Sequence, residues 1–203
     1  MTRSFPFRTI GDKGDKVQSM ELSTYLDEED ESHQMHEYLN GYVYALPSRD
    51  SAQDLLLKHI SNQIQEQHLP NAFVLPLDMR VQTPEPTYIY YPGLCVSHRA
   101  PKADQAVVPD PVLLVELVTP TTERLILHEK AMNYRHIQSI KQIIYVWPQS
   151  KSVQVDVRDA DSSSWKRTTH SIEEKISLTP SFGRGELVLG DIFNEMVRSI
   201  SSD

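Results

Sequence analysis

Residues 112–118 constrain the fold more than any other part of the sequence. Six of these seven residues are apolar, in the order Val-Leu-Leu-Val-Glu-Leu-Val. A strand that is apolar at nearly every position is typical of a sheet covered on both faces. The segment therefore predicts a central strand between two layers, with one glutamate, Glu116, in its interior.

A second buried strand is predicted over residues 142–147, which include Ile143-Ile144-Tyr145-Val146. Between the two strands, Thr121 or Thr122 is expected to cap a helix that runs to about His136. A strand, a helix and a second strand at this spacing predict a βαβ-like unit or its equivalent in a mixed sheet.

The strongest local signal is Asn40-Gly41, which stands between aromatic and β-branched residues and predicts a type I′ hairpin. Asp50 or Ser51 is expected to begin a helix. Further strands are predicted over residues 72–81, 88–97 and 153–157, the last paired with residues 162–170. We expect a disordered tail over residues 1–18 and one α/β or mixed α+β domain over residues 19–203, with a mixed sheet flanked by helices.

Composition excludes several classes of protein. The 203 residues carry a formal charge of −8, which argues against non-specific coating of nucleic acid but leaves room for a local basic cleft. The single cysteine, Cys95, forms no intrachain disulfide and no cysteine-type zinc site. No apolar run approaches the ~20 residues of a spanning helix. We therefore expect a cytoplasmic protein without a membrane segment, a phosphate-binding glycine loop or a Gly-x-Ser-x-Gly nucleophile.

Two charged residues break apolar patterns. Glu116 is costly inside a buried strand unless it is paired or binds a metal, so a structural salt bridge and a functional site both remain open. Lys130 lies in the stripe Ile126, Leu127, Lys130, Tyr134. It either extends its ammonium to solvent at the helix edge or points towards Glu116. Together, the two residues suggest a polar site at a strand edge.

Two further groups have weaker signals. Glu37, in the hairpin, is either an ordinary exposed strand residue or a third acid of the same site. His98, Arg99 and Lys102 follow the strand that ends near Ser97, and they form either a solvated loop or a set of phosphate contacts.

The order of several short motifs resembles the Uma-two family, described as restriction endonucleases of the PD-(D/E)XK nuclease superfamily and especially numerous in cyanobacteria. The resemblance runs from about residue 20 to the C-terminal helix. The motifs are His36-Glu37-Tyr38-x-x-Gly41, Asp78-Met79-Arg80-Val81, Tyr91-Pro92, Asp110-Pro111-x-Leu113-x-Val115-Glu116-x-x-Thr119-Pro120-x-Thr122-Glu123 and Glu129-Lys130-x-x-x-Tyr134.

This resemblance implies a restriction-endonuclease-like core, a homodimer, and hydrolysis of DNA phosphodiesters with Mg²⁺ or Mn²⁺. It also implies that Glu116 is a metal ligand and that Lys130 and Glu37 belong to the catalytic site. In such a site, carboxylates on adjacent strands hold the metal, which lowers the pKa of a bound water, and the lysine orients that water.

The sequence departs from the family pattern at two positions. Gly93 stands where relatives carry the metal-binding aspartate after Tyr-Pro, and Ile126 stands where relatives often carry an acid. We therefore expect an endonuclease-fold protein whose hydrolytic activity is weak or lost. The alternative on the same fold is a non-catalytic protein that binds nucleic acid or acts as a dimeric interaction domain.

Overall fold

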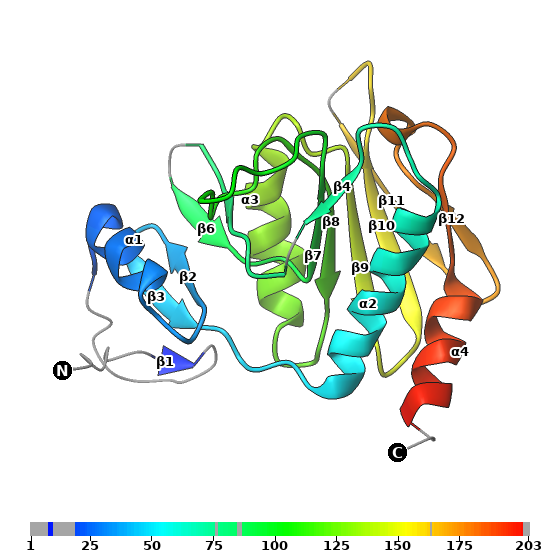
Figure 1. The fold of residues 1–203 in the computed structure, drawn as a ribbon, viewed down its shortest axis with the longest axis horizontal. Coiled ribbons are helices and arrows are strands. Elements are labelled where there is room, and N and C mark those ends of the chain that lie inside the picture. The colour runs from blue at the N-terminus through cyan, green and yellow to red at the C-terminus, as the bar shows by residue number, and fades with distance from the viewer. Residues whose placement is uncertain (1–7, 10–18, 76, 85–86, 163, 201–203) are drawn as a thin grey trace.

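The computed structural model describes residues 8–9, 19–75, 77–84, 87–162 and 164–200. Its elements form a large sheet, a small sheet and a two-stranded ribbon, with helices packed against them (Figure 1). The helices are α1 (Leu22–Asp30), α2 (Ser51–Glu66), the π-helix η1 (Leu125–Lys130), α3 (Ala131–Arg135), the 3₁₀ helix η2 (Pro180–Phe182) and α4 (Leu189–Ile200).

The large sheet has six strands in the order β11-β10-β9-β8-β7-β4. These strands are β4 (Phe73–Leu75), β7 (Leu94–Ser97), β8 (Pro111–Leu117), β9 (Gln142–Trp147), β10 (Ser152–Arg158) and β11 (Trp165–His170). Strands β8 and β9 are parallel and the other neighbours are antiparallel. The sheet is therefore mixed, and η1 with α3 forms the crossover that the sequence predicts between its two parallel strands.

The small sheet has the order β1-β3-β2-β6-β5, and a separate ribbon pairs β12 with β13. The strands are β1 (Arg8–Thr9), β2 (His36–Leu39), β3 (Tyr42–Ala45), β5 (Val81–Gln82), β6 (Tyr88–Tyr90), β12 (Lys175–Ser177) and β13 (Glu186–Val188). Asn40 and Gly41 both have positive φ, at 48° and 96°, as the predicted hairpin turn between β2 and β3 requires. Of the tail predicted over residues 1–18, only Arg8 and Thr9 lie among the described residues, and they form β1.

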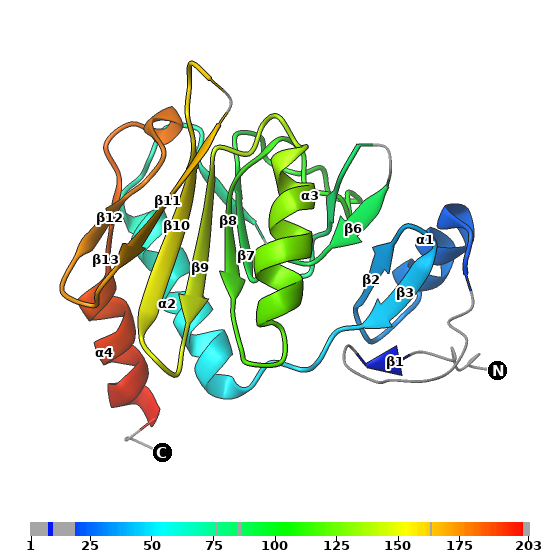
Figure 2. The same cartoon turned by 180° about the vertical axis from the view of Figure 1, so that it is seen from behind.

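The two faces of the large sheet are covered by different helices (Figures 1 and 2). On one face, Leu56, Leu57 and Ile60 of α2 and Phe193 of α4 pack against the strands. On the other face, Tyr134 of α3 packs in a second apolar cluster. Helix α2 begins at a capping box, in which Asp50 accepts a hydrogen bond from the N–H of Gln53 and the Gln53 side chain accepts one from the N–H of Asp50.

Three predicted elements differ from the structure. Residues 88–97 are not one strand, because β6 belongs to the small sheet and β7 to the large one, and the chain crosses between them at Tyr91-Pro92-Gly93. Pro92 has no N–H for a ladder, so the break falls where the chain can leave a sheet. Residues 72–81 likewise divide between β4 and β5. The crossover helix begins at Glu123, directly after Thr121 and Thr122 as predicted, but six of its residues, Leu125–Lys130, are π-helical, which the sequence does not indicate.

Candidate active site

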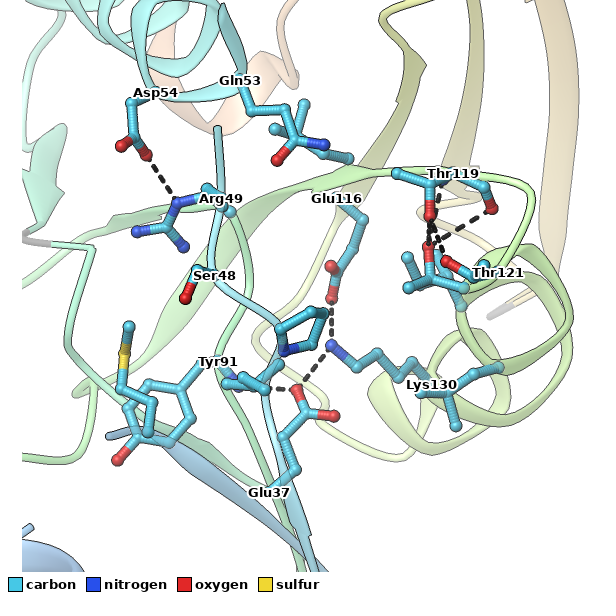
Figure 3. A pocket seen from close by; sticks show the side chains of 18 of the residues that line it. Glu37, Ser48, Arg49, Gln53, Asp54, Tyr91, Glu116, Thr119, Thr121 and Lys130 are labelled. Carbon is cyan, nitrogen blue, oxygen red and sulfur yellow. Dashed lines mark hydrogen bonds and ion pairs between the residues drawn. The ribbon is translucent and has the colours of Figure 1, made fainter. Parts of the chain in front are cut away.

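Three charged side chains meet in the protein interior, and each comes from a different element. Glu37 lies on β2, Glu116 on β8 and Lys130 at the end of η1. The ammonium of Lys130 lies 2.6 Å from Glu37 Oε1 and 3.3 Å from Glu116 Oε1 (Figure 3). All three side chains are at most 4% exposed. The structure thus brings together the three residues that the sequence singled out, and it excludes both the solvent-directed lysine and the exposed Glu37.

Neighbouring groups fix the two carboxylates. The hydroxyl of Tyr134 donates a 2.6 Å hydrogen bond to Glu116 Oε1, and the backbone N–H of Tyr91 donates a 3.1 Å bond to Glu37 Oε1. Glu37 Oε2 is buried and has no hydrogen-bond partner among the described residues. Four donor contacts therefore converge on Glu37 Oε1 and Glu116 Oε1, while Glu37 Oε2 has no donor among the described residues.

The pKa values of these groups reflect their burial and their neighbours. Burial raises the pKa of Glu37 above its ordinary value of 4.5, with Glu116 adding to the shift and Lys130 opposing it. For Lys130, burial alone would lower the pKa, but Glu116 and Glu37 outweigh it and raise the pKa above 10.5. Burial and then Glu116 raise the pKa of Tyr134 well above 10.0, so its hydroxyl remains a donor. Lys130 therefore carries its positive charge at neutral pH, between the carboxyl groups of Glu37 and Glu116.

The three residues line a cavity of about 790 Å³. Its lining comes from the β2 region, the N-terminal end of α2, the crossing segment near Tyr91, the end of β8 and η1 (Figure 3). The other polar lining residues are His33, Gln34, Ser48, Arg49, Gln53, Asp54, Thr119, Thr121, Thr122 and Gln149. At the rim, Arg49 Nε donates a 2.7 Å hydrogen bond to Asp54 Oδ1.

Gly93 lies opposite Glu116 at the edge of this cavity. Strands β7 and β8 pair Leu94 with Val115, so the same register continued by one residue places Gly93 beside Glu116. A Cβ at position 93 would lie 3.0 Å from Leu57 Cδ2 and 3.1 Å from the Val115 carbonyl oxygen. The side chain of Leu57 and the backbone of β8 therefore crowd the space that an aspartate side chain at position 93 would need.

The residues present do not fit the divalent metal site that the family resemblance implies. Position 93 has no side-chain oxygen, and Ile126, the second departure, is buried in the apolar cluster around α3. Glu37 and Glu116 share a single ammonium, which already supplies a positive charge between them. Among the described residues, no group of three or more His, Cys, Asp and Glu side chains is arranged to hold a metal ion.

The basic cluster predicted after β7 lies away from the cavity. His98, Arg99 and Lys102 follow the end of β7 opposite to Gly93, and none of them lines the cavity. Arg99 forms a 2.6 Å ion pair with Asp110, and the ring of His98 packs against Phe182. The predicted phosphate contacts of this cluster are therefore not part of the cavity that holds Glu116.

Sequence reasoning missed the positively charged rim residue Arg49. No periodicity marks it, because it lies just before the cap of α2 and approaches Glu116 only through the tertiary fold. Tyr134 was visible in the helical stripe as a core residue, but its hydrogen bond to Glu116 had no sequence signal.

The mixed sheet flanked by helices is a nuclease-like fold, and Glu116 of its central strand β8 belongs to the buried Glu-Lys-Glu cluster. The chain matches the Uma2 family, described as "Putative restriction endonuclease", over residues 22–188. Because the match covers most of the sequence, the chain belongs to this family.

The fold is also similar to a solved structure, the crystal structure of a "putative nuclease belonging to DUF820" from Anabaena variabilis. The TM-score is 0.61 at 14% sequence identity, and the similarity covers 84% of this chain and 98% of that one. At this identity the likeness shows the fold alone. No curated protein matches the chain. None of the helices in the described part of the chain has the length and hydrophobicity needed to cross a bilayer.

Replacing Lys130 by methionine is expected to destabilise the protein by about 3–5 kcal/mol at neutral pH, because two buried carboxylates lose their shared cation. Urea unfolding measures this change. Lys58→Met, at an exposed position of α2, is the control and should change stability little. The double variant Lys130→Met/Glu37→Gln should recover part of the loss, and a single-variant effect no larger than that of Lys58→Met would contradict the prediction.

The raised pKa of Glu37 predicts a specific pH dependence. A carboxyl group with a raised pKa in the folded state stabilises the fold below its unfolded value of 4.5, and this stability is lost as pH rises through the folded pKa. The free energy of unfolding of the parent should therefore fall, relative to Glu37→Gln, as pH increases from 4.5. Glu66→Gln, at an exposed position of α2, should follow the parent. Parallel curves for the parent and Glu37→Gln would refute the assignment.

Proposed function

We propose that this chain is an endonuclease-fold protein, related to metal-dependent DNA endonucleases, whose hydrolytic activity is weak or lost. In this proposal Glu116, Lys130 and Glu37 are what remains of the catalytic site. The observation that carries it is the position of Gly93 opposite Glu116, together with the capture of both remaining carboxylates by Lys130.

The charge in the cavity supports weak or absent catalysis. Three carboxylates line it, from Glu37, Asp54 and Glu116, against the two cations Arg49 and Lys130. In the transition state, negative charge develops on the non-bridging oxygens of a phosphodiester and on the leaving oxygen, so catalysis depends on positive groups that face these oxygens. The lining alone does not supply positive charge in excess.

Lys130 is poorly placed to compensate. Its ammonium is buried and contacts both carboxylates, so turning towards a phosphate would leave Glu37 and Glu116 without their shared cation. In a complete site a second carboxylate would bind a Mg²⁺ or Mn²⁺ ion that supplies the missing positive charge. In this chain Glu37 and Glu116 hold the lysine instead, and the hydroxyl of Tyr134 orients Glu116.

The same observations favour one alternative, a non-catalytic protein that binds nucleic acid or a protein partner through this fold. DNA as the partner, a cytoplasmic location and a single domain over residues 19–203 remain part of the proposal. His98, Arg99 and Lys102 remain candidates for weak contacts with nucleic acid outside the cavity.

Restoring the carboxylate at position 93 tests the proposed defect. Gly93→Asp should increase Mn²⁺-dependent nicking of supercoiled DNA by at least about a hundredfold, since a Lewis-acid metal contributes several kcal/mol and ~1.4 kcal/mol is one decade of rate. Because Leu57 crowds this position, Gly93→Asp/Leu57→Val should be more active than Gly93→Asp alone. Calorimetry should detect Mn²⁺ binding in both variants but not in the parent.

Gly93→Asn is the matched control, because it adds a side chain of similar size without the charge. Glu116→Ala, introduced into the repaired variant, should abolish both nicking and Mn²⁺ binding. Equal cleavage by the parent, dependent on Glu116, would show that the parent is active. If neither repaired variant cleaves or binds Mn²⁺, Gly93 is not the main defect.

The homodimer is also part of the proposal and rests on the family resemblance. Of the tyrosines near the hairpin, Tyr38 is buried within its own chain, whereas Tyr42 is 42% exposed. Light scattering should give the mass of a dimer, and Tyr42→Ser should weaken it because aromatic side chains are enriched at interfaces. Phe73→Ser, at a residue of β4 that is 41% exposed, is the matched control. A monomer at all accessible concentrations would refute the dimer.

A further inference from the structure

Part of the large sheet is left open on the side of α3. Figure 2 shows α3 in front of the sheet near β7 and β8, and no other described helix lies in front of β10 and β11 on this side. Alternation along the strands places Asp156 and Arg158 of β10, and Trp165 and Arg167 of β11, on this open face. Arg135, the last residue of α3, lies beside them.

Three guanidinium groups gather here around one carboxylate. Asp156 is fully buried and accepts hydrogen bonds from Arg135 Nη2 at 2.8 Å and from Arg167 Nε and Nη2 at 2.6 and 2.8 Å. The hydroxyl of Tyr145 donates a fourth hydrogen bond to Asp156, at 3.1 Å. Arg158 forms no ion pair among the described residues and donates to the backbone carbonyls that end α3, including those of Arg135 and Ile137. The cluster therefore has two positive charges in excess.

Burial and the neighbouring positive charges change the properties of Arg158 and Arg135. Burial and then the neighbouring Arg135 lower the pKa of Arg158. Arg135 Nε is buried and has no hydrogen-bond partner in the described part of the chain. In a chain of net charge −8, this is a local concentration of positive charge, in which Asp156 is the one carboxylate paired with these arginines among the described residues.

An aromatic ring completes the surface. Trp165 is half-buried, with the guanidinium of Arg158 4.6 Å and that of Arg135 5.5 Å from its ring centroid. Arg135 and Arg167 remain 35% and 37% exposed, so both reach solvent while they pair with Asp156. Apart from Asp156, the acids closest in sequence to Arg158 are Asp159 and Asp161, in the turn after β10. The carboxylate of Asp159 accepts hydrogen bonds from the N–H groups of Asp161 and Ser162 in that turn.

We propose that the open face formed by Arg135, Arg158, Arg167 and Trp165 is a second binding surface, which contacts the phosphate backbone of duplex nucleic acid. Arg135 and Arg167 present partly exposed, planar guanidinium groups that match phosphate oxygens, whereas Arg158 is only 9% exposed and contributes its charge from the interior. Such contacts are typical of binding to the nucleic-acid backbone rather than of base reading. The inference rests on the proposed function only in taking DNA as the partner. It does not depend on the chemistry at Glu116.

The surface and the cavity lie at opposite ends of one helical segment. From Leu125 to Arg135 the chain advances about 15 Å at ~1.5 Å per residue. A duplex that spans roughly 34 Å per turn is long enough to reach both. The open face would then provide the attraction that the lining of the cavity lacks.

Fluorescence anisotropy with the full chain and a labelled duplex of about 20 base pairs, two helical turns, tests the proposal. Arg135→Gln and Arg167→Gln each leave one guanidinium on Asp156, so both variants should fold, as checked by thermal melting. Each should weaken binding about fivefold or more at low salt and reduce the slope of log Kobs against log salt by about 0.9, the value for one phosphate contact. The loss should be equal for two duplexes of unrelated sequence.

Lys175→Gln is the charge-matched control. Lys175 is exposed on β12, where it pairs with Glu186, and its replacement should leave the affinity and the salt slope unchanged. Arg135→Lys should retain most of the salt slope, because it keeps the charge. A parent that does not bind duplex DNA, or Arg135→Gln and Arg167→Gln variants that behave like Lys175→Gln, would overturn the proposal.

The result is separable from the test at Gly93. Binding that depends on Arg135, without cleavage by the Gly93→Asp variants, supports this surface and rejects the proposed cause of inactivity. If Gly93→Asp cleaves DNA, and Arg135→Gln changes neither this cleavage nor the affinity for the duplex, the proposed cause of inactivity is supported and the second binding surface is rejected.

Discussion

The buried ammonium of Lys130 is the point at which charged side chains from both sheets meet, within a contact that is otherwise apolar. Glu37 belongs to the small sheet, Glu116 to the large sheet and Lys130 to the helix that crosses between two parallel strands. In an interior of low dielectric constant these charges are tolerated only while they remain in contact. The same three side chains thus connect the two sheets and line the cavity, so a substitution that weakens this contact also changes the shape and charge of the cavity.

The distribution of charge differs between the cavity and the open face of β10 and β11. Acids outnumber bases in the cavity, whereas the open face of β10 and β11 has more guanidinium groups than carboxylates. A protein of overall negative charge can attract a polyanion only through such a local excess of positive charge. In the arrangement proposed here, recognition and chemistry lie on different surfaces, so loss of one does not remove the other.

Much of the fold was predictable because its signals are local. The apolar run of β8, the Asn40-Gly41 turn and the capped start of α2 each follow from neighbouring residues. Glu116 and Lys130 were detectable because each interrupts an apolar pattern. The crossing at Tyr91-Pro92-Gly93 was not predicted, since the segment is apolar or aromatic on both sides of Pro92-Gly93 and its composition does not show that the two halves join different sheets. The arginine cluster was also missed, because its members are ordinary surface residues until the sheet register and the end of α3 bring them together around Asp156.

The π-helical turn of η1 affects how the site can be compared between relatives. Such a turn carries one more residue than an α-helical turn between the same two ends, so it is equivalent to a single-residue insertion in the helix. The insertion changes the direction in which the following side chains leave the axis. Lys130 is the last residue of this turn, and its position between the two carboxylates depends on that extra residue. A relative that lacks the extra residue would keep α3 in place but present a different residue to Glu116. A sequence alignment without a gap in η1 would then pair residues that occupy different positions in space.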